Sequence, residues 1–180
     1  MKAINLKTEH LVNPIGIDIR TPYLSWNCEG GKKQTAYEIE AMADGEVILN
    51  SGKIASHKMN HCFGVAAASK QRVTWKVRLW DETGAAGEWS EEAFFEMGIL
   101  EKSQFVAKWI NPERTCDPEI HKPASYLKNT FVMDSQTLKK TRENGSGRLY
   151  VTAHGLYEAW INGRRVGDFV LAPGSYNYDK

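Results

Sequence analysis

The sequence predicts an all-β protein built from two tandem β-sandwich modules. Short segments that alternate apolar and polar residues recur along the chain, and turns rich in Gly, Asn and Asp separate them. This spacing is typical of β-sandwiches. No long segment shows the 3.6-residue period of a helix, and the short patch AAASKQR at 66–72 is predicted to be a loop.

The first module is predicted to span residues 1–98. Segment 36–41 alternates, with Tyr37, Ile39 and Ala41 on one face and polar or small residues on the other. Asp44-Gly45 then predicts a hairpin turn. The clearest alternation places four apolar residues on one face of the next strand: Val73, Trp75, Val77 and Leu79.

The end of the first module is predicted to be a Gly-rich turn followed by a last strand. The turn is DETGAAGEWS at 81–90 and the strand is EEAFFEMG at 91–98. Large aromatic side chains dominate small β cores. Trp26, Trp75 and Trp89 are therefore expected to fill the core of this sandwich.

Residues 99–123 contain three prolines and no clean period, which predicts a linker and an irregular entry into a second module, 124–180. Strands are expected at 125–134 and 149–153, with a polar surface loop at 135–148 between them. Even counted from residue 104, the part of the chain after the first module has only about 75 residues and a long loop, which leaves few strands, and an open sheet has an unpaired edge. The second module is therefore expected to be incomplete.

The closing segment YEAWINGRRVGDFV, 157–170, is predicted to be a β-hairpin. Tyr157, Ala159 and Ile161 alternate with polar neighbours, and Asn162-Gly163 supplies the two positive-φ residues of a type I′ turn. The partner strand is expected in RRVGDFV, at 164–170.

Composition excludes two classes of partner. The 23 basic and 22 acidic residues nearly cancel, so nucleic acid is not expected. No run approaches the roughly 18 apolar residues of a membrane span. Cys28, Cys62 and Cys116 form no CxxC pair, which favours reduced thiols in a cytoplasmic protein.

The hairpin offers a candidate sugar site, formed by Trp160, Asn162, Asp168 and Tyr176. An indole face can stack on the apolar side of a pyranose, while amide and carboxylate oxygens accept hydroxyl protons. The alternative is structural, because Asn162 is already explained by the turn and Asp168 follows a glycine.

No catalytic residue and no metal site are predicted. Glu158 and Asp168 are the most suggestive acids, but the alternation directs Glu158 to solvent. Inverting glycosidases need two carboxyl groups facing each other across the scissile bond. His57 and His61 are four residues apart, which would place them on one face only of a helix, and no helix is expected there.

The ordered motifs of the first module resemble a known family. HLVNPIGID, TPYLSWN, QTAYEIEA, SGKIAS, VTWKVRLWDETG and WSEEAFFEMGIL are similar to the amino-terminal fibronectin type III-like domain of bacterial α-L-rhamnosidases of glycoside hydrolase family 78. The segments AKWI, YLKNTF and LYVTAHGLYEAWINGRRVGDFVLAPGSYNYDK resemble the start of the family's next module, a jelly-roll-like rhamnosidase N-terminal β-sandwich. The loop TLKKTRENGSG is longer than the family pattern, and Ser175 stands where a bulkier residue is expected.

The resemblance implies a non-catalytic, amino-terminal fragment of an α-L-rhamnosidase, because nothing in the chain matches the family's catalytic α/α barrel. Its partners would be that barrel in cis and, through the full-length enzyme, rhamnose-containing glycosides. No cofactor is expected; the resemblance leaves calcium open. A stand-alone carbohydrate-binding protein and a protein-interaction module remain as alternatives, since a fold does not fix a function.

Overall fold

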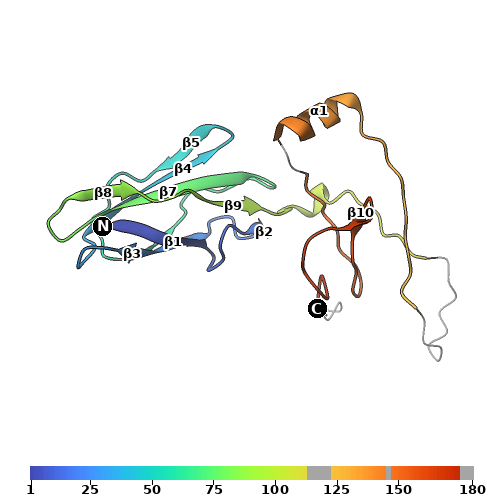
Figure 1. The fold of residues 1–180 in the computed structure, drawn as a ribbon, viewed down its shortest axis with the longest axis horizontal. Coiled ribbons are helices and arrows are strands. Elements are labelled where there is room, and N and C mark those ends of the chain that lie inside the picture. Colours follow the sequence, from blue (N-terminus) through green and yellow to red (C-terminus); the bar gives the residue numbers. More distant parts are fainter. Residues whose placement is uncertain (113–122, 145–146, 175–180) are drawn as a thin grey trace. The chain divides into compact units, whose positions relative to one another are not determined.

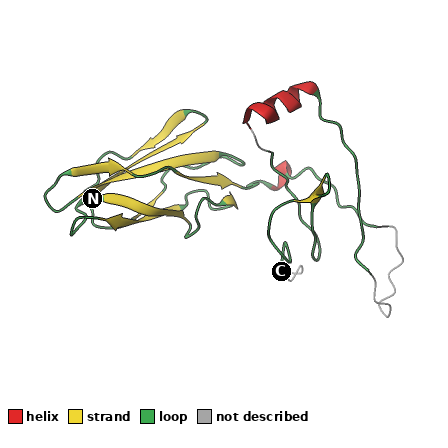
Figure 2. Cartoon of the chain, viewed as in Figure 1, coloured by secondary structure: helices red, strands yellow, loops and turns green. Residues whose placement is uncertain are grey.

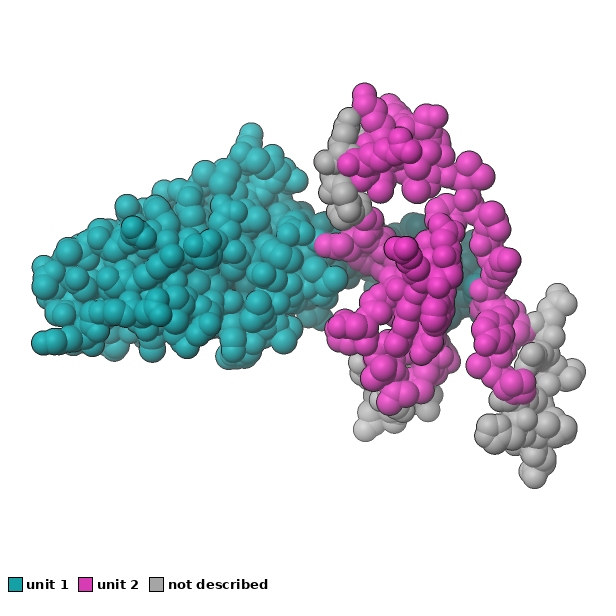
Figure 3. All heavy atoms as spheres, viewed as in Figure 1, with its two compact units in different colours: residues 1–110 teal, residues 111–180 magenta. Residues whose placement is uncertain are grey.

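The structure, a computed structural model, describes residues 1–112, 123–144 and 147–174. The chain divides into two compact units, Met1–Ile110 and Asn111–Lys180, coloured separately in Figure 3. The predicted module boundaries at 98 and 123 stay predictions.

Unit 1 consists of two β-sheets (Figures 1 and 2). The smaller sheet has the order β1-β3-β6, and its strands are β1 (Lys2–Thr8), β3 (Tyr23–Glu29) and β6 (Asn60–Cys62). The larger sheet has the order β2-β9-β7-β4-β5, and its strands are β2 (Ile15–Ile17), β9 (Ala93–Met97), β7 (Arg72–Trp80), β4 (Ala36–Ala43) and β5 (Glu46–Asn50). All pairs are antiparallel except β2 with β9. This confirms the all-β class; the fibronectin type III label stays a prediction.

The core lies between the two sheets and follows the predicted alternation. The inward face of β7 is fully buried along Val73, Trp75, Val77 and Leu79, as is Ile39 on β4. The Trp75 indole N–H donates to the Thr8 hydroxyl at 3.2 Å, so a hydrogen bond joins the sheets inside the core. Every second residue of these segments is buried, which explains why both form strands at the centre of the sheet.

One of the three predicted core tryptophans is placed elsewhere. Trp26 and Trp75 are buried, but Trp89 is half-buried on the outer face of the larger sheet. The reason is a strand that was not predicted: β8 (Ala86–Trp89) lies within the segment expected to be only a turn, and it pairs with β7. The prediction for 81–90 was wrong at this point, because its Gly-rich composition hid a short strand.

The turn before β8 is closed by a side chain. One Asp81 carboxylate oxygen accepts hydrogen bonds from the Thr83 hydroxyl, the Thr83 N–H and the Ala85 N–H. These bonds favour the charged form and lower the pKa of Asp81. In the other predicted hairpin, Asp44 and Gly45 have φ of 52° and 84°, as a two-residue turn requires.

Unit 2 differs from the prediction in its first part. The polar segment predicted to be a loop contains the helix α1 (Ser135–Asn144), and the segments 125–134 and 149–153 are not strands. Asp134 precedes the helix and caps it: its carboxylate accepts from the Thr137 N–H at 2.7 Å and from the Thr137 hydroxyl at 2.8 Å. That N-terminal cap was not recognised in the sequence.

No residue of unit 2 whose exposure the structure describes is buried. Leu149 and Val151, which alternate as a strand should, are 49% and 41% exposed. An alternating segment becomes a strand only when a partner strand and a covering layer are present. In the described part of the chain, unit 2 offers neither to 149–153, which explains the missing strand.

Candidate functional site

The closing hairpin has the predicted turn geometry. Strand β10 (Trp160–Ile161) pairs with β11 (Arg164–Arg165) in antiparallel register. Asn162 and Gly163 have φ of 49° and 76°, both positive as a type I′ turn needs. The Val166 N–H donates to the Ala159 carbonyl at 2.8 Å and continues the ladder.

The base of the hairpin is closed by one further bridge. The Tyr157 N–H donates to the Ala172 carbonyl at 2.9 Å, which joins the incoming and outgoing chain. Leu171 has φ of 56°, and the Ala172-Pro173 bond is cis. The predicted strand at 157–161 is thus shortened to two residues and one isolated bridge.

Arg165 organises one face of the hairpin. It lies directly opposite Trp160. Its guanidinium donates to the Phe169 carbonyl at 2.6 Å and lies 3.5 Å from the Glu158 carboxylate. Side chains two residues apart share a face, so Glu158, Trp160 and Arg165 project together. Arg165 was missed from the sequence, although the two-residue turn fixes the register that places it there.

The four predicted sugar-site residues are placed as follows. Trp160 is 58% exposed on β10, and Asn162 occupies the turn. Asp168 is exposed and follows Gly167, which has φ of 74°. Tyr176 lies outside the described residues. The structure therefore supplies one exposed indole beside a guanidinium, and the sugar site itself stays a prediction.

The two most suggestive acids of the hairpin, Glu158 and Asp168, are both exposed. Glu158 is engaged with Arg165, an exposed ion pair of small energetic value. Within residues 1–112, 123–144 and 147–174, no group of three or more His, Cys, Asp or Glu side chains could hold a metal ion. His61 instead bonds the Tyr37 hydroxyl, with 3.0 Å between Nδ1 and the oxygen.

The outer face of the larger sheet in unit 1 carries a ladder of charged and aromatic side chains. Arg78 on β7 contacts the Glu38 carboxylate of β4 at 2.7 Å, and its guanidinium lies 4.9 Å from the Trp89 ring of β8. Lys76 makes the same two contacts: its ammonium nitrogen lies 2.8 Å from the Glu40 carboxylate and 5.0 Å from the centre of the Trp89 ring. Each cation is shared between an acid and an indole, a cation–π arrangement.

Among the described residues, no helix is both long and apolar enough to cross a membrane. Cys28 and Cys62 both carry free thiols. Cys116 lies outside the described residues.

Fold and site together define a class: an immunoglobulin-like β-sandwich followed by a second unit that presents an exposed β-hairpin. The chain belongs to the family described as Rha78A-like, N-terminal immunoglobulin domain, whose model matches residues 3–101. A second family model, described as alpha-L-rhamnosidase N-terminal domain, matches residues 142–180. The predicted family resemblance is confirmed.

Curated relatives extend this similarity over most of the chain. An alpha-L-rhamnosidase of Formosa agariphila is 33% identical over 202 residues, covering 93% of this chain and 20% of the relative. An alpha-L-rhamnosidase of an Alteromonas species is 32% identical, covering 99% of this chain and 21% of the relative. The chain therefore spans about a fifth of the length of these relatives.

Solved structures are similar in fold. The native α-L-rhamnosidase of Aspergillus terreus has a TM-score of 0.72 and 28% identity, covering 99% of this chain and 20% of that one. The α-L-rhamnosidase of Dictyoglomus thermophilum has a TM-score of 0.68 at 24% identity, covering 96% of this chain, a likeness that shows the fold alone. The Streptomyces avermitilis enzyme complexed with L-rhamnose has a TM-score of 0.54 over 61% of this chain.

Proposed function

We propose that this chain is an amino-terminal, non-catalytic region of an α-L-rhamnosidase, and that it supports the catalytic barrel of the full-length enzyme. The observation that carries the proposal is the order of the two matches: the immunoglobulin-type model at 3–101 is followed by the rhamnosidase N-terminal model at 142–180. Relatives that match nearly the whole chain are α-L-rhamnosidases of about five times its length.

The parent reaction would be hydrolysis of terminal α-L-rhamnosyl bonds with inversion. One carboxylic acid protonates the leaving group, and one carboxylate activates water on the opposite face of the sugar. Glu158, one of the two most suggestive acids, is paired with Arg165. The proposal therefore assigns both catalytic groups to the barrel and none to this chain.

An assay of the chain with a chromogenic α-L-rhamnoside tests this role. We expect no turnover above the rate in buffer. Turnover that is abolished by Glu158→Gln or by Asp168→Asn would overturn the proposal. Reading the coding sequence beyond Lys180 is the second test: a continuous frame that encodes an acid-rich α/α barrel is expected, and an immediate stop codon in the natural gene would contradict it.

A second candidate function is carbohydrate binding at the hairpin, favoured by the exposed Trp160 indole beside Arg165. Asn162, Asp168 and Tyr176 would provide the polar contacts. Titration with L-rhamnose, with and without calcium, tests this role through saturable changes in tryptophan fluorescence. Binding lost in Trp160→Ala and retained in Trp109→Ala would support it, because Trp109 is also exposed but lies in the other unit. An absence of saturation under both conditions would leave support of the barrel as the function.

We also propose a cytoplasmic location. The free thiols of Cys28 and Cys62 support it, because disulfides form and persist mainly in oxidising compartments. Fractionation of the native host tests the location: recovery of the protein from the culture medium or the periplasm would refute it.

A further inference from the structure

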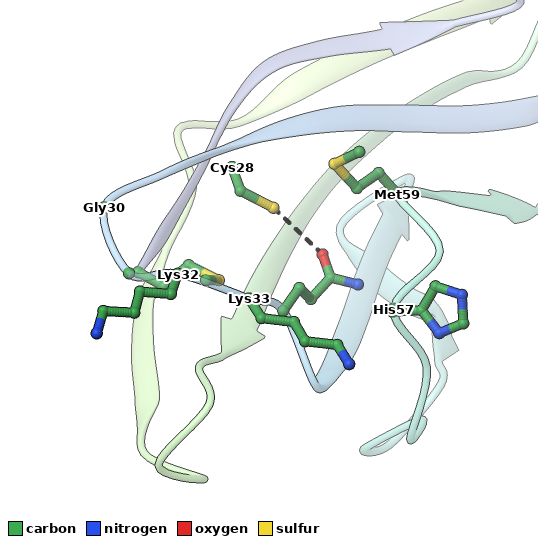
Figure 4. Close-up of a pocket in the computed structure, with 9 residues that line it drawn as sticks. Cys28, Gly30, Lys32, Lys33, His57 and Met59 are labelled. Carbon is green, nitrogen blue, oxygen red and sulfur yellow. Dashed lines mark hydrogen bonds between the residues drawn. The ribbon is translucent and has the colours of Figure 1, made fainter.

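The two units differ in how far their own residues cover their apolar side chains. Unit 1 buries Trp26, Val73 and Phe95 between its sheets. At its cavity of about 310 Å³, the Cys28 thiol donates to the Gln34 side-chain oxygen, 3.5 Å away (Figure 4). Unit 1 thus covers its core with its own residues.

Unit 2 leaves its large apolar side chains in solvent. Tyr126 is 97% exposed, Val132 is 94% exposed and Phe169 is 80% exposed. Exposed apolar residues recur within a few positions of one another along 126–133. Large exposed apolar patches commonly mark surfaces that a partner covers. Unit 2 therefore carries an apolar surface that its described residues leave uncovered.

Segment 125–134 has the pattern of a strand that lacks a partner. Phe131 and Met133 are two residues apart, so an extended chain directs both to one face. Residues 124–133 are all described, and no backbone N–H or carbonyl among them bonds another backbone group. Apart from the Thr130 N–H, which donates to a side chain, these groups can pair with a neighbouring strand, as at an open sheet edge.

Segment 149–153 has the same pattern beside a part of unit 2 that is already paired. Leu149 and Val151 would share one face of an extended chain, and both are exposed. A few residues further on, strand β10 pairs with β11, and the Tyr157 N–H donates to the Ala172 carbonyl. The hairpin is thus a formed element close in sequence to a segment that has not formed a strand.

We propose that unit 2 is a docking surface for further β-strands of the same polypeptide, and that segments 125–134 and 149–153 become strands when these strands pair with them. The incoming strands would alternate apolar and polar residues, so that their backbones complete the hydrogen-bond ladder and their apolar side chains cover the exposed faces. The inference rests on the proposed function, because it takes the partner from the longer enzyme.

The lengths of the relatives favour this partner over a second copy of the chain. Two curated relatives match 93% and 99% of this chain with 20% and 21% of their own length, so most of each relative lies outside the match. A strand on the same polypeptide meets unit 2 at a high effective concentration, whereas a second copy must be recruited from solution.

The test is hydrogen exchange, followed by mass spectrometry, on the 180-residue chain and on the gene product that continues beyond Lys180. Both are measured at concentrations at which light scattering shows monomers. In the 180-residue chain, the amides of 125–134 should exchange nearly as fast as in an unfolded peptide, while those of β7 stay protected. In the longer protein, exchange of 125–134 should slow by roughly 100-fold or more, with β7 unchanged.

The longer protein also separates this inference from the proposed function. Hydrolysis of a chromogenic α-L-rhamnoside with 125–134 still unprotected would overturn the inference and leave the proposed function standing. Protection of 125–134 without hydrolysis would do the reverse. Protection that arises in the 180-residue chain only as it dimerises would make a second copy the partner, and would overturn the inference as well.

Neighbouring substitutions on opposite faces provide the matched control. Val151 and Thr152 are both exposed, so Val151→Asp and Thr152→Asp should leave the thermal unfolding of the 180-residue chain unchanged. In the longer protein, Val151→Asp should lower the Tm by about 5 °C or more, because it places a carboxylate in the covered face. Thr152→Asp should have a smaller effect.

A milder pair of variants keeps this test decisive if Val151→Asp prevents folding of the longer protein. Val151→Ala removes two methyl groups from the covered face and should lower the Tm more than Thr152→Ala does. Equal effects at the two positions in the longer protein, or a loss of stability caused by Val151→Asp in the 180-residue chain, would refute the docking of strands on this face.

Discussion

Replacing Thr8 by valine is expected to destabilise unit 1, although the two side chains have nearly the same shape. Thr8 is 1% exposed, and its hydroxyl oxygen accepts the only hydrogen bond that the structure records for the Trp75 indole N–H in the described chain. Valine leaves this N–H buried without a partner, which costs about 1–3 kcal/mol. For a unit of this size, each kcal/mol corresponds to roughly 4–6 °C in Tm.

The assay is thermal and urea unfolding of the full chain, followed by near-ultraviolet circular dichroism. Thr21→Val is the matched control, because Thr21 is exposed and its substitution should change stability by less than about 0.5 kcal/mol. Combining Thr8→Val with Trp75→Phe removes both partners, so the double variant should lose less than the sum of the two single losses. Additive losses, or a Thr8→Val variant as stable as the wild type, would refute the reasoning.

Three further predictions concern other parts of the chain. Burial lowers the pKa of His61 in the folded state. The contribution of neutral His61 to stability should therefore be complete above the unfolded pKa of about 6.5 and should be lost as the pH falls through the lowered folded pKa. In the variant His61→Phe, the Tm should depend less on pH in that range. Gly163→Val should disrupt the turn, since φ is 76° there, and hydrogen exchange of the Val166 amide should accelerate by tenfold or more, about 1–2 kcal/mol. Asp134→Ala removes the cap of α1 and should lower helical circular dichroism, whereas Asp134→Asn should retain most of it; equal spectra for both variants would contradict the capping role.

The two central strands of unit 1 could be predicted because each is buried on one face. Val73 and Val77 are inaccessible to solvent, so the alternation in the sequence records their burial directly. Trp89 could not be placed this way. An indole stacked beside Arg78 on an outer face has the same local sequence signature as an indole in a core. Which of the two it is depends on the register of β7, not on neighbours in the sequence.

The closing hairpin was predicted, but the segments before it were not. Asn162-Gly163 specifies its turn by backbone sterics alone, so no distant contact is needed. The helix α1 depends on a short cap at Asp134, a signal that a polar segment easily hides. The strand predicted from the alternation of Leu149 and Val151 does not form, because both side chains are exposed and have no layer to pack against. Sequence rules for local structure predicted the hairpin, whose turn is specified by adjacent residues. They failed for segment 149–153, where strand formation depends on contacts with distant parts of the chain.

The ladder on the outer face of unit 1 acts as a check on strand alignment. Glutamates stand on β4, cations on β7 and an indole on β8, each row in step with its neighbours. A slip of one residue would turn Arg78 and Lys76 toward the core and leave Glu38 and Glu40 without counter-charges. The face that contributes nothing to the core thus disfavours a one-residue slip of the strands that build the core.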